Sequence, residues 1–240
     1  MAKDLSRRRF LGVAGAAAGA AAGPSLAKAA DAKPAGGKLR IVAVCCSPRK
    51  GKTTAASLNV CLAAAGAVDA RIETELIELA GMDIDGSLAA GVPLAPGRKD
   101  DFPKLVEKLA DPAVGGIVVG TPVYFGNMTS LCKAFLDRCM VFRKKDFALA
   151  DKVAGVLAVG GARNGGQEIT IQSVQAALLC QEMILVGDGR PTGHFGATVW
   201  SGGKNDVTED AFGMATAKNL GRRVAQVALR LAGQSPAGGR

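Results

Sequence analysis

The sequence has few aromatic residues and a single histidine, and these shortages argue against several classes of function. Aromatic residues make up 4% of the 240 residues, with one His, one Trp and one Tyr. The formal net charge is +9, but no long basic run interleaved with aromatic residues follows the N-terminal segment, so we expect no nucleic-acid binding. A Ser-His-Asp hydrolase would have to use His194, and the chain has no G-x-S-x-G motif for its nucleophile. The remaining interpretations of His194 are a plain loop residue, or the lining of an acceptor pocket with Phe195 and Trp200.

The six cysteines show no C-x-x-C spacing, which leaves a zinc or iron–sulfur site without support. Cys132 and Cys139 are two helical turns apart, about 10 Å along a helix axis, which is too far for a disulfide within one helix. A chain that folds in a reducing compartment does not depend on disulfides. We therefore predict buried thiols and no metal site.

The N-terminal segment has the pattern of an export signal. Arg7, Arg8 and Arg9 precede a short Ala- and Gly-rich apolar run, which ends before the A-x-A-like sequence Ala27-Lys28-Ala29. The run is too short and too rich in glycine to span a bilayer stably, and "SRRRFLG" resembles a twin-arginine signal. We expect a signal peptide over residues 1–29, a linker over 30–37, one domain over 38–233 and a disordered tail over 234–240. The alternative is that this segment is a disordered basic arm or an uncleaved membrane anchor.

Apolar runs that read as buried strands alternate with segments that read as helices. This alternation predicts one parallel sheet covered on both faces, a doubly wound α/β domain. Five strands suit the flavodoxin-like order 2-1-3-4-5, in which a ligand lies beyond the carboxyl ends of the strands. The predicted strands cover 38–46, 70–79, 114–122, 151–161 and 183–187, the predicted helices cover 53–68, 101–112, 128–142, 167–182 and 209–233, and 81–100 and 188–207 are expected to be loops.

The loop after the first strand, "CCSPRKGKTT", predicts a phosphate site. Unpaired N–H groups at a helix N-terminus bind anions, Ser47, Thr53 and Thr54 can add hydroxyl donors, and nearby basic side chains can offset a dianion. A nucleoside triphosphate is disfavoured, because Cys46 stands where a Walker loop needs glycine and Pro48 fixes the backbone. The bland alternative is an exposed basic turn.

The loop after the third strand predicts a planar ligand. Tyr124 and Phe125 place aromatic rings at the strand end, Gly126 permits close approach of the backbone, and Asn127 offers a donor and an acceptor. A ring with alternating polar edge atoms, such as an isoalloxazine, fits this set. Aromatic residues at a strand end also occur as simple core residues.

Three segments, "SPRKGKTT", "GTPVYFGNMTSLCKAFLDR" and "VGGARNGGQEITIQSV", together resemble the NAD(P)H-dependent FMN reductase family, whose relatives include iron–sulfur flavoproteins and quinone reductases. The resemblance runs from about residue 38 to about residue 233 and implies a flavodoxin-like fold with FMN as cofactor. By this resemblance, the residues that hold the phosphate are Ser47, Arg49, Thr53 and Thr54, with Lys52 beside them. The residues that line the isoalloxazine, partly through backbone N–H groups, are Pro122, Val123, Tyr124, Phe125, Gly126 and Asn127. The residues that close the pyrimidine side of the ring are Gly161, Arg163, Asn164 and Gly165.

The resemblance also implies NAD(P)H as electron donor and no compulsory side-chain acid or base. Arg163 and the amides of Gly165 and Gly166 are candidates to stabilise the reduced ring near N1 and O2. Members of the family commonly form dimers or tetramers, so we expect a homo-oligomer, with a quinone or similar small molecule as acceptor. The cysteine cluster of the iron–sulfur members has no counterpart between residues 81 and 102, which predicts a flavoprotein without a cluster.

The predicted export bears on the electron donor. Twin-arginine export carries folded, cofactor-loaded proteins, which implies the export machinery as a partner and a periplasmic location, where NAD(P)H is scarce. Two alternatives therefore stay open beside the NAD(P)H oxidoreductase: an exported flavodoxin-like electron carrier with a protein redox partner, and a flavin-delivery module.

Overall fold

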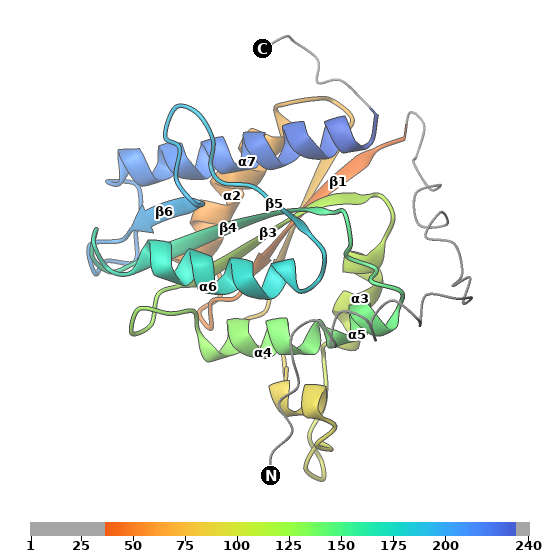
Figure 1. The fold of residues 1–240 in the computed structure, drawn as a ribbon. Coiled ribbons are helices and arrows are strands. Elements are labelled where there is room, and N and C mark those ends of the chain that lie inside the picture. The colour runs from red at the N-terminus through yellow and green to blue at the C-terminus, as the bar shows by residue number, and fades with distance from the viewer. Residues whose placement is uncertain (1–36, 234–240) are drawn as a thin grey trace, which may run out of the picture. The chain divides into compact units, whose positions relative to one another are not determined.

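A computed structural model describes residues 37–233 of the chain (Figure 1). The predicted signal peptide and C-terminal tail lie outside the described residues, so these two boundaries stay predictions. The described residues form a parallel six-stranded sheet with the strand order β2-β1-β3-β4-β5, and β6 also pairs with β4. The predicted flavodoxin-like fold and strand order are thereby confirmed.

The central strands of the sheet are short, mostly apolar runs, and β2 alternates apolar and polar residues, as the sequence predicts. Their bounds are β1 Leu39–Cys45, β2 Ile72–Glu78, β3 Val114–Pro122, β4 Val153–Gly160, β5 Ile184–Leu185 and β6 Ala197–Trp200. Residues of β3 and β4 are buried almost without interruption, because both faces of the central strands are covered. Cys45 of β1 lies in register with Gly120 of β3, so the loops that follow these two strands leave the sheet side by side.

The helices form one layer on each face of the sheet (Figure 1). On one face, α2 Thr53–Gly66 and α7 Ala211–Leu231 cover a core that includes Ile41, Ala43 and Leu157. They pack closely at Gly221, where an added Cβ would lie 1.9 Å from the carbonyl oxygen of Cys61. On the other face, a second core includes Val42 and Val44 and is covered by the helices α3 Pro103–Ala110, α4 Ser130–Arg138, α5 Met140–Lys144 and α6 Gln167–Leu179.

The fifth position of the sheet differs from the prediction. The sequence predicts one strand over 183–187 and an irregular loop over 188–207, whereas the structure has β5 beside Val153 and Ala154, and β6 within that loop. The chain leaves the sheet after β5 and returns at Gly196, where an added Cβ would lie 2.3 Å from the carbonyl oxygen of Val156. The four-residue β6 was missed because so short a run shows no clear periodicity.

Two other predicted elements are divided differently. The predicted helix over 128–142 is two helices, α4 and α5, separated at Cys139. Its start moves to Ser130 because the Thr129 hydroxyl accepts a hydrogen bond from the Cys132 N–H at 3.1 Å and so caps α4. The predicted loop over 81–100 contains a short 3₁₀ helix, η2 Gly86–Ala90.

Within residues 37–233, no helix is both long enough and apolar enough to cross a bilayer.

Candidate functional site

The three loops that the sequence singles out meet at one rim of the sheet. The Cys46 N–H donates to the Gly120 carbonyl at 2.7 Å, and the Thr129 hydroxyl donates to the Cys46 carbonyl at 2.8 Å, so the first loop is tied to the second. The Val123 N–H donates to the Val159 carbonyl at 2.9 Å, which ties the second loop to the end of β4. The loops after β1, β3 and β4 therefore form one continuous site, which lies where the strand order reverses.

The first loop is shaped by Ser47. Its side chain is buried, accepts from the Arg49 N–H at 3.1 Å and donates to the Arg49 carbonyl at 3.2 Å. The Ser47 hydroxyl thus stabilises the turn by hydrogen bonds to the Arg49 backbone, whereas the sequence predicted a hydroxyl that is free to donate to a phosphate. Arg49 is exposed and donates to the Asn205 side chain at 2.6 Å, which brings the loop after β6 to the same rim. Lys52 is exposed at the N-cap of α2.

The N-terminus of α2 has the features of an anion site. Lys52 provides no side-chain cap, and the first turn of this 14-residue helix carries no acidic residue. The N–H groups of the first turn therefore lack a side-chain cap from the part of the chain that the structure describes. Thr53 and Thr54 are both buried. The Thr54 hydroxyl is one of three buried side-chain polar atoms in the described residues that have no hydrogen-bond partner. Because such atoms are rare, an unsatisfied hydroxyl in the first turn of an uncapped helix fits a bound phosphate.

A carboxylate already lies at this loop. The Gly51 N–H donates to Glu78 Oε2 at 2.7 Å from the end of β2. Gly51 has a φ of 66°, a conformation that glycine adopts at little cost. The Gly51 N–H is therefore engaged, which leaves the first turn of α2 and the Thr54 hydroxyl as the donors for a phosphate.

The second loop turns at Tyr124 to Asn127. The N–H groups of these two residues donate to each other's carbonyls at 2.8 and 3.1 Å, and the central residues have φ values of 51° at Phe125 and 72° at Gly126. This is the backbone of a type I′ turn, with a non-glycine residue in the left-handed region. Within this turn, the N–H groups of Phe125 and Gly126 have no backbone partner among the described residues. The predicted hydrogen bonds from the backbone to a ligand ring are therefore limited to these two amides.

The aromatic side chains of this turn face solvent. Tyr124 is 47% exposed and Phe125 is completely exposed. The bland interpretation, that these aromatic residues belong to the core, is therefore wrong. They are available to a planar ligand or to another protein surface.

The third loop touches the second through two glycines. At Gly166, with a φ of 91°, an added Cβ would lie 3.0 Å from the Gly126 Cα and 3.6 Å from Val123 Cγ1. The loop is also held by hydrogen bonds between its backbone and the side chain of Gln167, a residue that the sequence analysis missed. The buried Gln167 side chain accepts from the Gly165 N–H at 2.9 Å and donates to the Ala162 carbonyl at 2.7 Å. The predicted Gly165 amide is therefore engaged within the loop, and Gly161 and Asn164 are exposed beside it.

Arg163 is held by a buried carboxylate. Its guanidinium forms an ion pair with Asp210, whose side chain is 1% exposed, and lies 5.7 Å from the ring centroid of Trp200. Asp210 caps α7 by accepting from the Gly213 N–H at 2.8 Å and also accepts from the Trp200 N–H at 2.6 Å. Arg163 thus fastens the third loop to the start of α7. If Arg163 contacts a flavin ring as predicted, its guanidinium must either keep Asp210 as a second partner or break the ion pair with Asp210.

His194 is bound to Asp188 after β5. The His194 ring nitrogen Nδ1 lies 3.2 Å from Asp188 Oδ2, and the backbone N–H of His194 donates to Asp188 Oδ1. The His194 ring also packs edge-on against the Phe212 ring, with 5.7 Å between the ring centroids. Trp200 instead contacts Arg163. These contacts give His194 a structural role in the chain that follows β5 and do not group it with Trp200.

The cysteines near the rim are buried and protonated. Loss of solvent raises the pKa of Cys45 to about 11 and raises the pKa of Cys46 well above its ordinary value, with the neighbouring Cys132 adding to the second effect. Across residues 37–233, no three Cys, His, Asp or Glu side chains come close enough together to hold a metal ion. The rim therefore offers backbone amides, hydroxyls and basic side chains to a ligand.

Comparison with known proteins agrees with this geometry. The family model described as NADPH-dependent FMN reductase matches residues 39–197. An iron-sulfur flavoprotein of Methanocaldococcus jannaschii is 37% identical over 193 residues, which cover 79% of this chain and 97% of that protein. An iron-sulfur flavoprotein of Methanosarcina thermophila is 34% identical over 192 residues, covering 79% and 95%. Among solved structures, a flavodoxin, WrbA-like protein of Agrobacterium tumefaciens has a TM-score of 0.56 at 19% identity, covering 80% of this chain and 99% of that one.

These relatives correct one prediction. The sequence analysis expected a flavoprotein without an iron–sulfur cluster, and the curated relatives are themselves named iron-sulfur flavoproteins. The expectation rested on the lack of cysteine between residues 81 and 102, and the names of these relatives contradict it. The predicted FMN cofactor is confirmed at the level of the family, whereas the assignment of individual residues to it stays a prediction.

Proposed function

The chain belongs to the NADPH-dependent FMN reductase family, and from this we propose that it is an oxidoreductase whose FMN takes electrons from NADPH or NADH. The observation that carries the proposal is the buried Thr54 hydroxyl in the first turn of α2, which has no hydrogen-bond partner among residues 37–233. A flavin mononucleotide needs a phosphate site and an adjoining surface for a flat ring, and the first and second loops supply these two features.

The residues divide the work of binding between them. Thr53, Thr54 and the first-turn amides of α2 would hold the phosphate, with the charges of Arg49 and Lys52 nearby. The Phe125 and Gly126 amides would donate to the polar edge of the ring, and Tyr124 would lie against it. When bound, FMN supplies hydride acceptance at its ring. The protein positions the ring, and no side chain has to move a proton.

The acceptor and the assembly are part of the same proposal. A small oxidant such as a quinone would receive the electrons, because a rim built from turns and exposed aromatic residues suits a flat apolar molecule. We also propose that the protein is a homodimer or homotetramer. The support is the pair of neighbouring exposed aromatic rings of Tyr124 and Phe125, an apolar surface that a second subunit would cover.

Export completes the proposal. The "SRRRFLG" sequence near the N-terminus supports transport of the folded, flavin-loaded protein by the twin-arginine route to the periplasm. NAD(P)H is scarce in that compartment, so the choice between NAD(P)H and another reductant as donor is the most informative property to measure.

Anaerobic mixing of the purified flavoprotein with NADPH or NADH tests the proposal. We expect the flavin band near ~450 nm to bleach, and a quinone to restore it over repeated turnovers at about 1 s⁻¹ or faster. Dithionite serves as the control for a flavin that can be reduced. Bleaching by dithionite with none by either nucleotide would contradict the proposal and favour a carrier that depends on a partner protein.

A further inference from the structure

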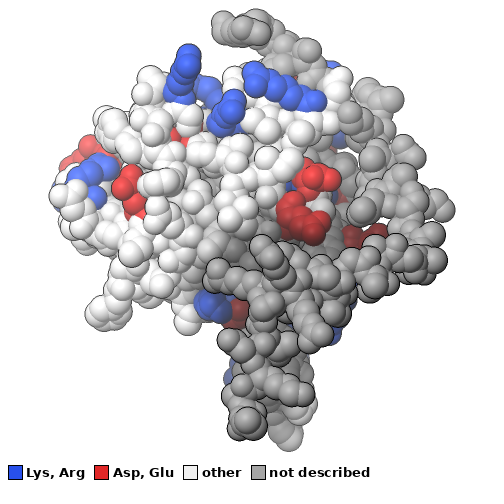
Figure 2. All heavy atoms as spheres, viewed as in Figure 1, with Lys and Arg blue, Asp and Glu red and all other residues white. Residues whose placement is uncertain are grey.

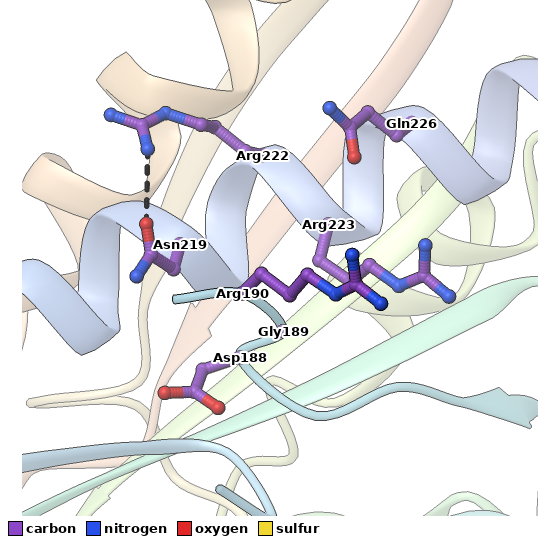
Figure 3. A pocket seen from close by; sticks show the side chains of 7 residues that line it. All are labelled: Asp188, Gly189, Arg190, Asn219, Arg222, Arg223 and Gln226. Atoms are coloured by element: carbon purple, nitrogen blue, oxygen red, sulfur yellow. Dashed lines mark hydrogen bonds between the residues drawn. The ribbon is translucent and has the colours of Figure 1, made fainter. Parts of the chain in front are cut away.

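A cavity of about 520 Å³ lies between α7 and the segment that follows β5. It is lined by residues 188–190 and by side chains of α7, and Figure 3 shows them from close by. None of its lining residues belongs to the three loops of the rim. Its volume is in the range of small-molecule sites. It exists because the chain leaves the sheet between β5 and β6, the feature that the sequence analysis missed.

The cavity has an excess of positive charge. Arg190, Arg222 and Arg223 line it, against a single carboxylate, Asp188. Asp188 is buried, and both of its oxygens are engaged by His194. The surrounding surface adds to this excess, because α7 carries four basic residues and no acidic one. Figure 2 shows Lys and Arg side chains gathered along the edge that α7 occupies in Figure 1.

Two of the three arginines have no side-chain partner within residues 37–233. Arg222 donates to the Asn219 side chain at 3.0 Å and points away from the other two in Figure 3. Arg190 and Arg223 extend in the same direction in that view, and neither makes a hydrogen bond or an ion pair with any described residue. Two guanidinium groups that share one cavity repel each other unless an anion lies between them.

The segment that carries Arg190 is fixed in place. Gly189 has a φ of 72°, and the Arg223 stem passes 3.5 Å from the position of a Gly189 Cβ. The Gly193 N–H donates to the Gly189 carbonyl at 2.6 Å, and Asn219 of α7 donates to the Thr192 hydroxyl at 2.9 Å. The arginines are therefore presented on a braced turn and a helix, which lowers the entropy cost of binding.

We propose that this cavity binds a small molecule through a diphosphate group. Guanidinium groups form paired hydrogen bonds with phosphate oxygens, and two of them match the charge of a diphosphate better than that of a single carboxylate. The Gln226 side chain, which also lines the cavity and has no partner among the described residues, adds amide donors. This site is separate from the phosphate site at the start of α2, which uses hydroxyls and backbone amides.

Calorimetric titration of the FMN-loaded protein with inorganic pyrophosphate tests the site, because bound FMN keeps the rim occupied. At low ionic strength we expect a dissociation constant below about 1 mM, weakened about tenfold or more by Arg223→Gln or Arg190→Gln. Arg230→Gln is the matched control, since it removes the same charge from α7 outside the cavity lining. Unchanged flavin content and melting temperature show that each variant is folded.

Three results would overturn the proposal. The first is no measurable binding of pyrophosphate to the unmodified protein. The second is an equal loss of affinity in Arg230→Gln, which would indicate general charge attraction. The third is binding of citrate as tight as that of pyrophosphate, which would remove the phosphate assignment.

Discussion

Replacing Thr54 with valine is expected to weaken FMN binding by about tenfold to a hundredfold while making the FMN-free protein more stable. The Thr54 hydroxyl is buried and has no partner in the described residues, so in the absence of FMN it carries a desolvation cost that an isosteric methyl group removes, about 1 kcal/mol. With FMN bound, the variant loses a hydrogen bond to a charged phosphate, about 1.5–3 kcal/mol. Flavin titration and urea unfolding of the FMN-free protein measure the two effects.

Ser57→Ala is the matched control for this substitution. Ser57 lies one turn further along α2, is equally buried, and its hydroxyl already donates to the Thr53 carbonyl at 2.8 Å. This variant should lower stability by about 1 kcal/mol and leave FMN affinity within about twofold. If Thr54→Val left FMN affinity unchanged, the hydroxyl would not belong to the phosphate site.

The second large effect is a steep loss of stability above about pH 9. Burial raises the pKa of Cys45 to about 11 and of Cys61 to about 12, and it also raises the pKa values of Cys46 and Cys139. A thiol whose folded-state pKa is raised contributes stability that is complete below the unfolded-state pKa and is lost as the pH rises towards the folded-state value. Four such thiols together remove about 5 kcal/mol per pH unit above about pH 9.

One buried group acts in the opposite direction. Lys152 donates to the carbonyls of Asp111 and Val114 at 2.8 Å, and burial lowers its pKa to about 8. Between that value and its ordinary one the unfolded chain binds more protons, so Lys152 adds about 1.4 kcal/mol per pH unit. The net loss is then about 4 kcal/mol per pH unit up to about pH 10.5 and about 5 kcal/mol per pH unit just above it. A domain with a total stability of about 10 kcal/mol should therefore unfold before about pH 12.

Urea unfolding under reducing conditions, repeated at several pH values, measures this slope. Cys61→Ala should reduce the slope by about 1.4 kcal/mol per pH unit. Cys180→Ala, which alters the exposed cysteine, should leave it unchanged. Equal slopes in the unmodified protein and Cys61→Ala would show that burial of this thiol does not govern alkaline stability.

The sheet could be predicted from the sequence because its central strands are unambiguous. β1, β3 and β4 are almost entirely apolar, which is typical of strands covered on both faces, and their order follows from the alternation with helices. β6 could not be predicted, because its place depends on pairing with β4 across a loop that starts and ends at close backbone contacts. The division of the helix at Cys139 likewise follows from packing and has no signal in the local sequence.

The convergence of the three loops was predicted, and the hydrogen bonds that hold them were not. Thr54 was named together with Ser47 and Thr53, because a helix N-terminus after a strand attracts phosphate, and this argument uses only the local sequence. Gln167 and Asp210 were missed because they act on Ala162, Arg163 and Trp200 through the fold. Asp210 carried one usable signal, its position directly before a helix, where aspartate is a favoured cap. Its pairing with Arg163 has no such signal.

A crystal structure of the FMN-loaded protein tests the central claim most directly. The account predicts the FMN phosphate within hydrogen-bond distance of the Thr54 hydroxyl and of the first-turn amides of α2, with the ring against the Tyr124–Asn127 turn. A phosphate seated instead on Arg190 and Arg223, or a ring bound away from that turn, would contradict it.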